Sequence, residues 1–190
     1  MGSRDKLLDA ACATFAHKGY QATSVDDLLG TAGVSPSNFY YHFKSKEVLA
    51  LECLERFFEG VRQELAPIFV NRKLGATAKL EQMHRQFVKR MSDKGCCGGC
   101  PLGNLAQELS DSHPGFRKRL AEFFEECMDG IAGIVKQGVA SGEFRKDLDP
   151  KAAGYLLFGS IEGLILLSKN MKDVKPLDLG FRLAVELLKR

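Results

Sequence analysis

Apolar side chains recur every three or four residues along almost the whole chain, and this spacing constrains the fold more than any other feature. Over residues 76–93 the apolar side of the predicted helix is formed by Leu80, Met83, Phe87, Val88 and Met91. No segment shows the two-residue alternation that is typical of a half-buried strand. A chain of 190 residues is long enough to bury a sizeable core. The sequence therefore predicts an all-α protein of about nine helices.

The first part of the chain is predicted to form three short helices followed by a long one over residues 45–69. Thr23 or Ser24 can cap the second helix and Ser35 the third, because a hydroxyl oxygen there accepts a hydrogen bond from an unpaired backbone N–H. Pro36 then takes the first helical position, where its missing N–H costs nothing.

The second and third helices, joined through a glycine turn, form a helix-turn-helix pattern. Phe39 and Phe43 are four residues apart, so they share one face, which we expect to point inward. The outer face then carries small polar groups and a phenol, which suit base edges and phosphates. These residues are Ser37, Asn38, Tyr41 and His42, with Tyr40 at the margin. The alternative is a three-helix packing unit whose tyrosines are merely exposed.

Net charge gives little support to nucleic-acid binding by itself. The whole chain carries +3, and residues 1–47 hold five basic and five acidic side chains. Binding would therefore depend on where the charges lie and on the avidity of a dimer. We expect Asp26 and Asp27, near the start of the second helix, to face away from DNA.

Segment 13–49, ATFAHKGYQATSVDDLLGTAGVSPSNFYYHFKSKEVL, resembles the DNA-binding domain of TetR/AcrR-type transcriptional repressors. The resemblance covers about residues 4–50 and rests on the Gly-Tyr break, the T-S-V-D-D cap and the F-Y-Y-H-F-K-S-K-E signature together. It implies a homodimer in which the second helix of the motif enters the major groove of an operator. It also implies a DNA-binding domain over residues 1–46 and an effector-binding and dimerisation domain over residues 47–190.

Carried over residue by residue, the resemblance gives an expected DNA-binding set in which Ser35 is the helix cap. At the groove it places Pro36, Ser37, Asn38, Tyr40, Tyr41 and His42. At phosphates it places Thr23, Ser24, Tyr41 and Lys46.

Residues 95–111, GCCGGCPLGNLAQELSD, are the second distinctive stretch. Cys100 precedes Pro101 and can cap a helix, whose positive end favours the thiolate. Three interpretations of Cys96, Cys97 and Cys100 stay open. The thiols can fill small spaces at a glycine-rich junction, they can sense oxidants or electrophiles, or they can bind a metal. A closed zinc site needs four ligands, and one C-x-x-C supplies two.

The same stretch resembles a segment that lies beside the ligand cavity in a subset of TetR-type regulators. This resemblance implies that Cys100, Asn104 and Gln107 approach an effector. We predict that further cavity-lining side chains come from the helices around it, and core packing is the alternative for each of them. These side chains are Met83, His84, Phe87, Met91, Phe123, Phe124, Cys127, Tyr155 and Phe158.

The segment 151–169 is apolar or small on most sides, and Gly159 and Gly163 permit close backbone approach. A helix of this kind must be covered all round. We predict a homodimer that pairs helices 151–169 and 177–190 across a two-fold axis, with burial inside a monomer as the alternative.

Cellular context is read from what the sequence lacks. We expect no membrane partner, because no apolar run reaches the length of about 20 residues that a spanning helix needs. The nearest candidate, residues 155–167, is short and carries Glu162. The first residues show no apolar signal region, so the six cysteines indicate a cytoplasmic protein with free thiols.

The resulting hypothesis is a ligand- or redox-responsive transcriptional repressor, released from double-stranded operator DNA by a small molecule of unknown identity. We expect no cofactor, no metal and no enzymatic activity, since the sequence shows no catalytic constellation of Ser, His and Asp or of paired carboxylates. The alternative is a cytoplasmic thiol-redox or metal-binding protein that uses Cys96, Cys97 and Cys100.

Overall fold

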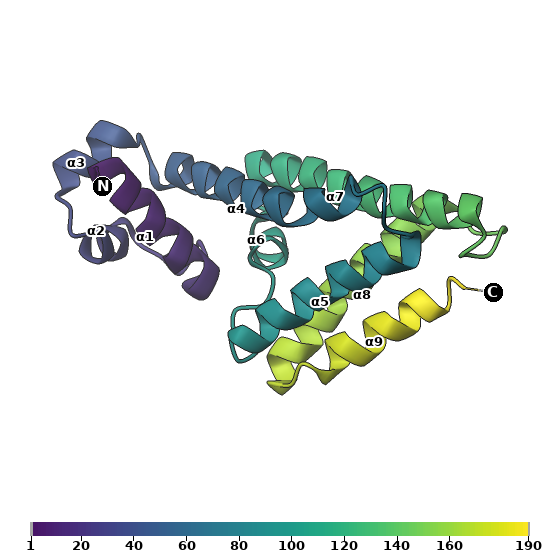
Figure 1. Ribbon diagram of the computed structural model, residues 1–190. Coiled ribbons are helices and arrows are strands. Elements are labelled where there is room, and N and C mark those ends of the chain that lie inside the picture. The colour runs from purple at the N-terminus through teal and green to yellow at the C-terminus, as the bar shows by residue number, and fades with distance from the viewer. Residues whose placement is uncertain (1, 190) are drawn as a thin grey trace. The chain divides into compact units, whose positions relative to one another are not determined.

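The computed structural model describes residues 2–189 and is built from α-helices (Figure 1). In chain order these are α1 (Ser3–Lys18), α2 (Val25–Ala32), α3 (Pro36–His42), α4 (Lys46–Phe69), α5 (Ala76–Asp93), α6 (Pro101–Leu109), α7 (Pro114–Ser141), α8 (Pro150–Met171) and α9 (Lys175–Glu186). The described residues contain no strand. The prediction of an all-α chain with about nine helices is confirmed.

The contacts within the chain divide it into two compact units. Among the described residues, the first unit contains those up to Val61 together with Pro101–Leu120, and the second contains Arg62–Cys100 and the residues from Ala121 onward. This division differs from the expected boundary after residue 46, because the first half of α4, all of α6 and the start of α7 pack with α1–α3. Helices α4 and α7 each contribute to both units.

The core of the first unit gathers side chains from each of its N-terminal helices. Leu7, Leu28, Phe39, Phe43 and Leu49 are fully buried there. The Ser24 hydroxyl accepts a hydrogen bond from the Asp27 N–H, and the Asp27 carboxylate accepts one from the Ser24 N–H, so α2 begins with a capping box. Gly33 ends α2 in a left-handed conformation with φ of 63°.

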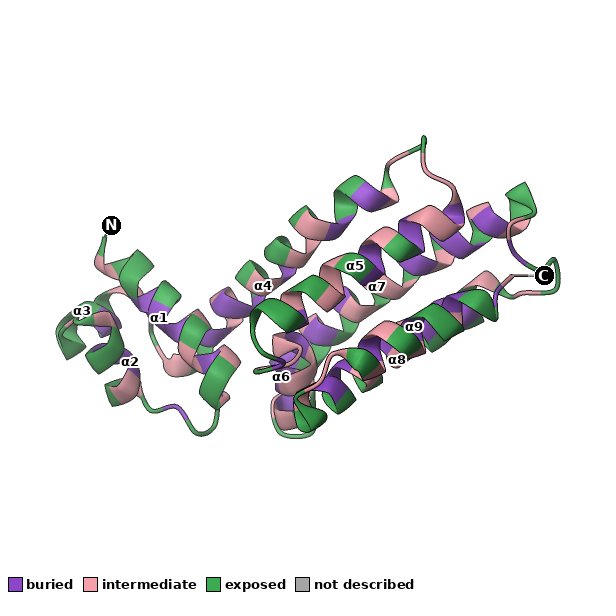
Figure 2. Cartoon of the chain, turned by 60° about the horizontal axis from the view of Figure 1, so that its bottom comes forward, coloured by how far each residue is buried: buried purple, intermediate pink, exposed green. Residues whose placement is uncertain are grey.

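The second unit packs α5, α8, α9 and the later part of α7 around long apolar side chains. Figure 2 shows the buried stripes on these helices, and α8 lies directly beside α9. Gly154 permits a close approach between α7 and α8: a Cβ at that position would lie 2.7 Å from the Met128 carbonyl oxygen. Any larger residue at 154 would therefore separate the two helices.

Helix α8 is long and apolar enough, by length and composition alone, to cross a membrane. Its most apolar window has a mean hydropathy of 1.3, and 33% of that window is buried. This departs from the sequence-based expectation, because the helix extends well beyond residues 155–167 at both ends. Helices of soluble proteins meet the same criterion where other protein covers them. The uncovered side of α8 therefore needs an explanation in terms of what packs against it.

Candidate functional site

Helix α3 presents one buried face and one open face, as its four-residue spacing predicts. Phe39 and Phe43 are buried, whereas the side chain of Tyr41 is 83% exposed and that of Tyr40 61% exposed. The rings of Phe39 and Tyr40 meet edge to face, with centroids 5.1 Å apart. The two phenylalanines thus fix the helix to the core while the tyrosines remain free to contact another molecule.

The first turn of α3 is exposed and polar. Ser35 caps the helix, since its Oγ accepts a hydrogen bond from the Asn38 N–H at 3.4 Å and lies 2.9 Å from the Ser37 Oγ. Pro36, Ser37 and Asn38 are all exposed. The donors and acceptors of this turn are therefore accessible, and a phosphate or base edge can reach them.

The last turn of α3 is held by the start of α1. The Nε2 of His42 lies 2.7 Å from the Ser3 Oγ, and the imidazole is half-buried. The Arg4 guanidinium lies 5.2 Å from the centroid of the Phe43 ring and also forms an ion pair with Glu52 of α4. Contacts from α1 and α4 therefore fix the orientation of α3.

The turn between α1 and α2 is tied down by Lys46, which we expected at a phosphate. Its Nζ donates hydrogen bonds to the carbonyl oxygens of Tyr20 and Thr23, at 3.0 Å and 2.9 Å, and lies 4.1 Å from the Tyr20 ring centroid. Thr23 was also expected at a phosphate, but its side chain is 1% exposed and its hydroxyl donates to the Gly19 carbonyl. Both side chains thus hold the turn, and only Ser24 of the expected pair on this turn is exposed.

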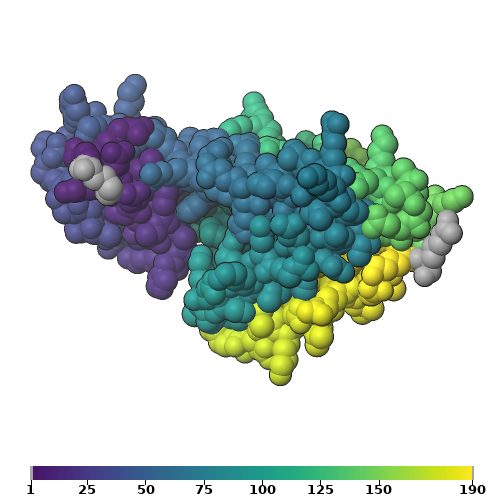
Figure 3. Space-filling model, viewed as in Figure 1, coloured from purple at the N-terminus to yellow at the C-terminus, as the bar shows by residue number. Residues whose placement is uncertain are grey.

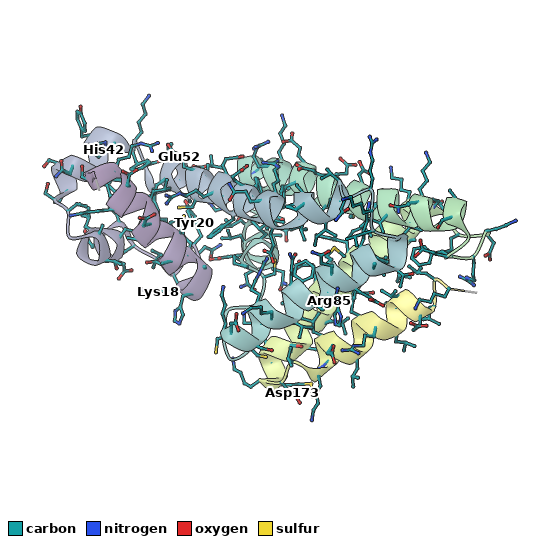
Figure 4. All side chains as sticks on the ribbon, viewed as in Figure 1. Lys18, Tyr20, His42, Glu52, Arg85 and Asp173 are labelled. Atoms are coloured by element: carbon teal, nitrogen blue, oxygen red, sulfur yellow. The ribbon has the colours of Figure 1, made fainter. Side chains whose placement is uncertain are left out.

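Glu108 of α6 also holds the turn between α1 and α2. Its carboxylate accepts hydrogen bonds from the Tyr20 N–H at 3.0 Å and the Gln21 N–H at 2.6 Å. Gly19, with φ of 87°, makes room for this carboxylate, because a Cβ there would lie 3.0 Å from Oε2. The Tyr20 ring, labelled in Figure 4, packs against His113 and Phe116. Helix α6 is therefore a structural part of the unit that carries α3.

Replacing Glu108 should loosen this turn. Glu108→Ala leaves the Tyr20 and Gln21 N–H groups without their carboxylate partner, and we expect the free energy of unfolding to fall by about 1–2 kcal/mol. Urea denaturation measures the loss, and hydrogen exchange should accelerate at those two amides. Gln107→Ala, at an exposed position of the same helix, is the control and should change neither quantity. Equal losses in the two variants would contradict the assignment.

Asp27 is held by local contacts on α2. Hydrogen bonds from Ser24 and Lys18 lower the pKa of its carboxyl to about 2. Its carboxylate lies 2.9 Å from the Lys18 Nζ. Because the folded-state pKa is lowered, this contribution to stability is present above the unfolded pKa of about 4 and is lost as pH falls towards 2. The negative charge of Asp27 therefore stabilises the contact between α1 and α2.

Several side chains that we predicted around an effector lie at different depths in the second unit. Met83, Met91 and Phe123 are buried. His84 is buried against α9, where its ring stacks on Phe181 at 5.4 Å, and burial lowers its pKa. Tyr155 is 47% exposed on α8.

Two further residues of the predicted effector set, Asn104 and Gln107, lie on α6. The contacts assign them to the first unit, whereas Cys100 belongs to the second. Asn104 is half-buried and Gln107 is exposed.

The remaining members of the predicted set lie within the second unit as half-buried side chains. Phe124 and Phe158 are in ring contact, with centroids 5.2 Å apart, and Phe87 is also half-buried. Burial raises the pKa of Cys127 to about 12, so its thiol stays protonated. These side chains combine aromatic surface with a neutral sulfur.

Glu162 of α8 joins this group, and the sequence analysis did not select it. Its carboxyl forms a hydrogen bond with Cys100, while burial raises its pKa above the usual range. Its negative charge also acts on Cys127. The available signal was its position, since it is the one acidic residue between Pro150 and Met171. A half-buried carboxyl beside two thiols can anchor a polar group of a bound molecule.

The cysteine-rich segment 95–100 is a strained turn of the second unit. Cys96 is buried with φ of 54°, an unusual value for a residue other than glycine, and Cys97 is exposed. The Lys172 Nζ lies 3.5 Å from the Cys96 carbonyl oxygen and 3.7 Å from the Cys97 Sγ. Among the described residues, no group of three His, Cys, Asp or Glu side chains is arranged to hold a metal ion.

Helices α8 and α9 share a broad apolar face that nothing in the single chain covers. Exposed side chains along it are Tyr155, Leu156, Leu166, Leu167, Met171, Leu179, Leu183 and Leu187. Gly159 and Gly163 lie on the exposed side of α8 with open space around them. A groove of about 570 Å³ lies between the two helices and is lined by Leu156, Leu183 and Leu187, among others. Figure 3 shows these helices in yellow-green and yellow at the surface. The alternative of burial within the monomer is therefore wrong.

Comparison with known families finds two matches along the chain. Residues 7–53 match the model described as "Bacterial regulatory proteins, tetR family", and residues 76–184 match "Tetracyclin repressor-like, C-terminal domain". The first match includes α3, and the second includes α5 to α8 and most of α9.

Similar proteins span nearly the whole chain. The transcriptional repressor DhaR of Mycobacterium sp. (strain GP1) is 26% identical, over 97% of this chain and 91% of that protein. The transcriptional regulator LmrA of Bacillus subtilis is 30% identical, over 92% of this chain and 90% of its own. A crystal structure of a TetR regulatory protein from Rhodobacter sphaeroides is 28% identical, with a TM-score of 0.90 over 97% of this chain and 98% of that one.

Proposed function

Since this chain belongs to the TetR family of bacterial transcriptional regulators and is a ligand-responsive, DNA-binding repressor, we propose how its residues divide these tasks. Helix α3 reads the operator, α8 and α9 pair two copies, and the half-buried group around Glu162 receives the effector. The thiol-redox or metal-binding alternative is not favoured, because both matching families and the similar curated proteins are transcriptional regulators.

The exposed face of α3 carries the proposal for DNA binding. Tyr40, Tyr41 and Asn38 project from a helix whose other side is fixed by two buried phenylalanines. Such a helix can enter a major groove without repacking the core. Ser35, Ser37 and His42 complete the reading surface, with Ser24 at a phosphate. Lys46 and Thr23 act indirectly in this proposal, by holding the α1–α2 turn that positions α2 and α3.

DNA selection tests the proposed reading role. Purified protein incubated with a random double-stranded pool should enrich a two-fold symmetric sequence. Binding to that sequence should weaken steeply with added salt, because phosphate contacts release counterions. Failure to enrich any sequence at low salt would contradict the proposal.

The α8–α9 face is proposed as the dimer interface. Two copies related by a two-fold axis bring the same surface together, so each copy can cover the other's exposed leucines. Gly159 and Gly163 then allow the two α8 helices to approach closely. This arrangement also explains why a helix with the composition of α8 leaves one side uncovered in the single chain.

The effector is proposed to bind among Phe124, Phe158, Cys100, Cys127 and Glu162. The aromatic rings supply apolar walls, and the carboxyl and thiol groups supply a few polar contacts, a mixture typical of small-molecule sites. An effector that binds better to the DNA-free arrangement of the dimer shifts the population away from the operator. Helices α4 and α7 can carry this change, because each contributes to both units.

Among the residues proposed to bind the effector, Cys100 is the thiol that we propose an electrophile modifies. Cys100→Ser should blunt the release of operator DNA by an electrophile such as N-ethylmaleimide, because a hydroxyl does not form the adduct. Fluorescence anisotropy with the selected operator measures the release. Cys97→Ser is the matched control and should respond like the wild type. Normal release from the Cys100→Ser variant would eliminate Cys100 as the responsive residue.

A further inference from the structure

A second pair of thiols lies in the unit that carries α3, separate from Cys96, Cys97 and Cys100. Cys53 of α4 packs against α1 one turn before Cys12, and the two thiols lie close enough to shift each other's pKa. Cys53 is 1% exposed, and its Sγ also lies 3.8 Å from the Leu8 carbonyl oxygen. Cys12 is half-buried, so it is the less buried residue of the pair. Neither Cys12 nor Cys53 takes part in the proposed binding of DNA, of the effector or of a second copy.

The surroundings distinguish the two sulfur atoms chemically. The hydrogen bond from Cys53 lowers the pKa of Cys12, and the Arg56 guanidinium beside it acts in the same direction. Contact with Cys12 and burial both raise the pKa of Cys53. Arg56 is itself held in place by an ion pair with Asp9 of α1. The accessible Cys12 is therefore the nucleophile of the pair, and the buried Cys53 keeps its proton.

We propose that Cys12 and Cys53 form an oxidation site, at which a hydroperoxide converts the two thiols into a disulfide joining α1 to α4. The Cys12 thiolate attacks the terminal oxygen of the hydroperoxide, giving a sulfenic acid and an alkoxide that takes a proton from water. The Cys53 sulfur then attacks the Cys12 sulfur, forming the S–S bond as its own proton and the hydroxyl leave as water. Overall, two thiols and one hydroperoxide give one disulfide, one alcohol and one water.

The position of this bond links it to the reading helix. The disulfide closes a ring that contains residues 13–52, and therefore all of α2 and α3. The two sulfur atoms must approach to about 2.0 Å to form the bond, which shifts α1 against α4. The first turn of α1 holds His42 through Ser3, so that shift reaches the last turn of α3. In cytosolic proteins, disulfides are usually transient and sense redox conditions.

The chemical part of the proposal is tested without DNA. A variant with Cys96, Cys97 and Cys100 replaced by Ser removes the other thiol cluster, and it is treated with hydrogen peroxide. Mass spectrometry under non-reducing conditions should find the peptides of Cys12 and Cys53 linked and lighter by two hydrogen atoms. In Cys53→Ala, dimedone should label Cys12 as a trapped sulfenic acid, whereas in Cys12→Ala it should leave Cys53 unlabelled. No linked peptide, or labelling of Cys53 instead, would overturn the site.

The regulatory part rests on the proposed role of α3 in operator binding. Oxidation should lower operator affinity about tenfold, equivalent to the loss of about one good base contact. It should also raise Tm by roughly 5–15 °C, because the cross-link restricts the unfolded chain. A linked peptide with unchanged operator affinity would overturn the regulatory role alone. If the reduced protein binds no selected DNA, the proposed function has failed, while the linked peptide still decides whether the disulfide forms.

Discussion

Leu183→Glu should convert the dimer into monomers and lower operator affinity by about 100-fold or more. Leu183 is 60% exposed in the single chain and lies in the middle of the apolar stripe on α9, with Leu179 and Leu187 one turn to either side. A carboxylate there must be buried without a partner if the two copies pair, and that cost exceeds what the remaining contacts regain. In the proposed dimer each copy supplies one α3 helix to the operator, so separating the copies removes the avidity of two linked half-sites.

Light scattering coupled to size-exclusion chromatography measures the state of assembly, and fluorescence anisotropy measures binding to the selected operator. Ala121→Glu adds the same charge at an exposed position on α7 and should leave the dimer and its affinity unchanged. Circular dichroism should show full helix content in both variants, because neither position belongs to the core. A Leu183→Glu variant that still elutes as a dimer would show that a different surface pairs the copies.

Tyr41→Ala should lower operator affinity by about 10- to 100-fold without a change in stability. At 83% exposure its side chain contributes almost nothing to the core, so the free energy of unfolding should stay within about 0.5 kcal/mol of the wild-type value. The ring and hydroxyl project from the middle of the open face of α3, where they can reach a base edge or a phosphate. Tyr41→Phe separates the two groups: it keeps the ring and should lose only the contribution of the hydroxyl.

Val70→Ala provides the control for the Tyr41 experiment. Val70 is 74% exposed just after the end of α4 and lies outside the proposed reading surface of α3. Replacing it should not change the affinity for operator DNA. If Tyr41→Ala binds the operator as tightly as Val70→Ala at moderate salt, Tyr41 lies outside the interface. If Tyr41→Ala instead melts at a clearly lower temperature, its role is structural and the loss of affinity is indirect.

The reading helix could be derived from the sequence because its determinants are local. Ser35 as cap, Pro36 at the first position and the four-residue spacing of Phe39 and Phe43 together specify where α3 begins and which face it buries. The same reasoning places the exposed stripe of α9. These features depend on a few neighbouring residues, so tertiary packing does not change them.

The family resemblance implies that Thr23 and Lys46 lie at phosphates, and the structure shows that their polar groups pair with the backbone of the α1–α2 turn. Glu108 is distant from that turn in sequence, and no local pattern could show that it accepts the Tyr20 and Gln21 N–H groups.

The surroundings of two residues of the effector prediction also depend on distant parts of the chain. The His84 ring stacks on the Phe181 ring of α9, and the sequence of α5 alone could not predict this contact. Tyr155 shares its helix with buried residues, but it lies on the side of α8 that nothing in the single chain covers.

Methylation interference on the selected operator tests the central claim, that α3 reads the major groove from each copy of a dimer. Methylation of guanine N7, which lies in that groove, should block binding at two half-sites centred about one helical turn of 10–10.5 base pairs apart, or a multiple of it. Interference confined to adenine N3 in the minor groove, or to a single half-site, would contradict the account.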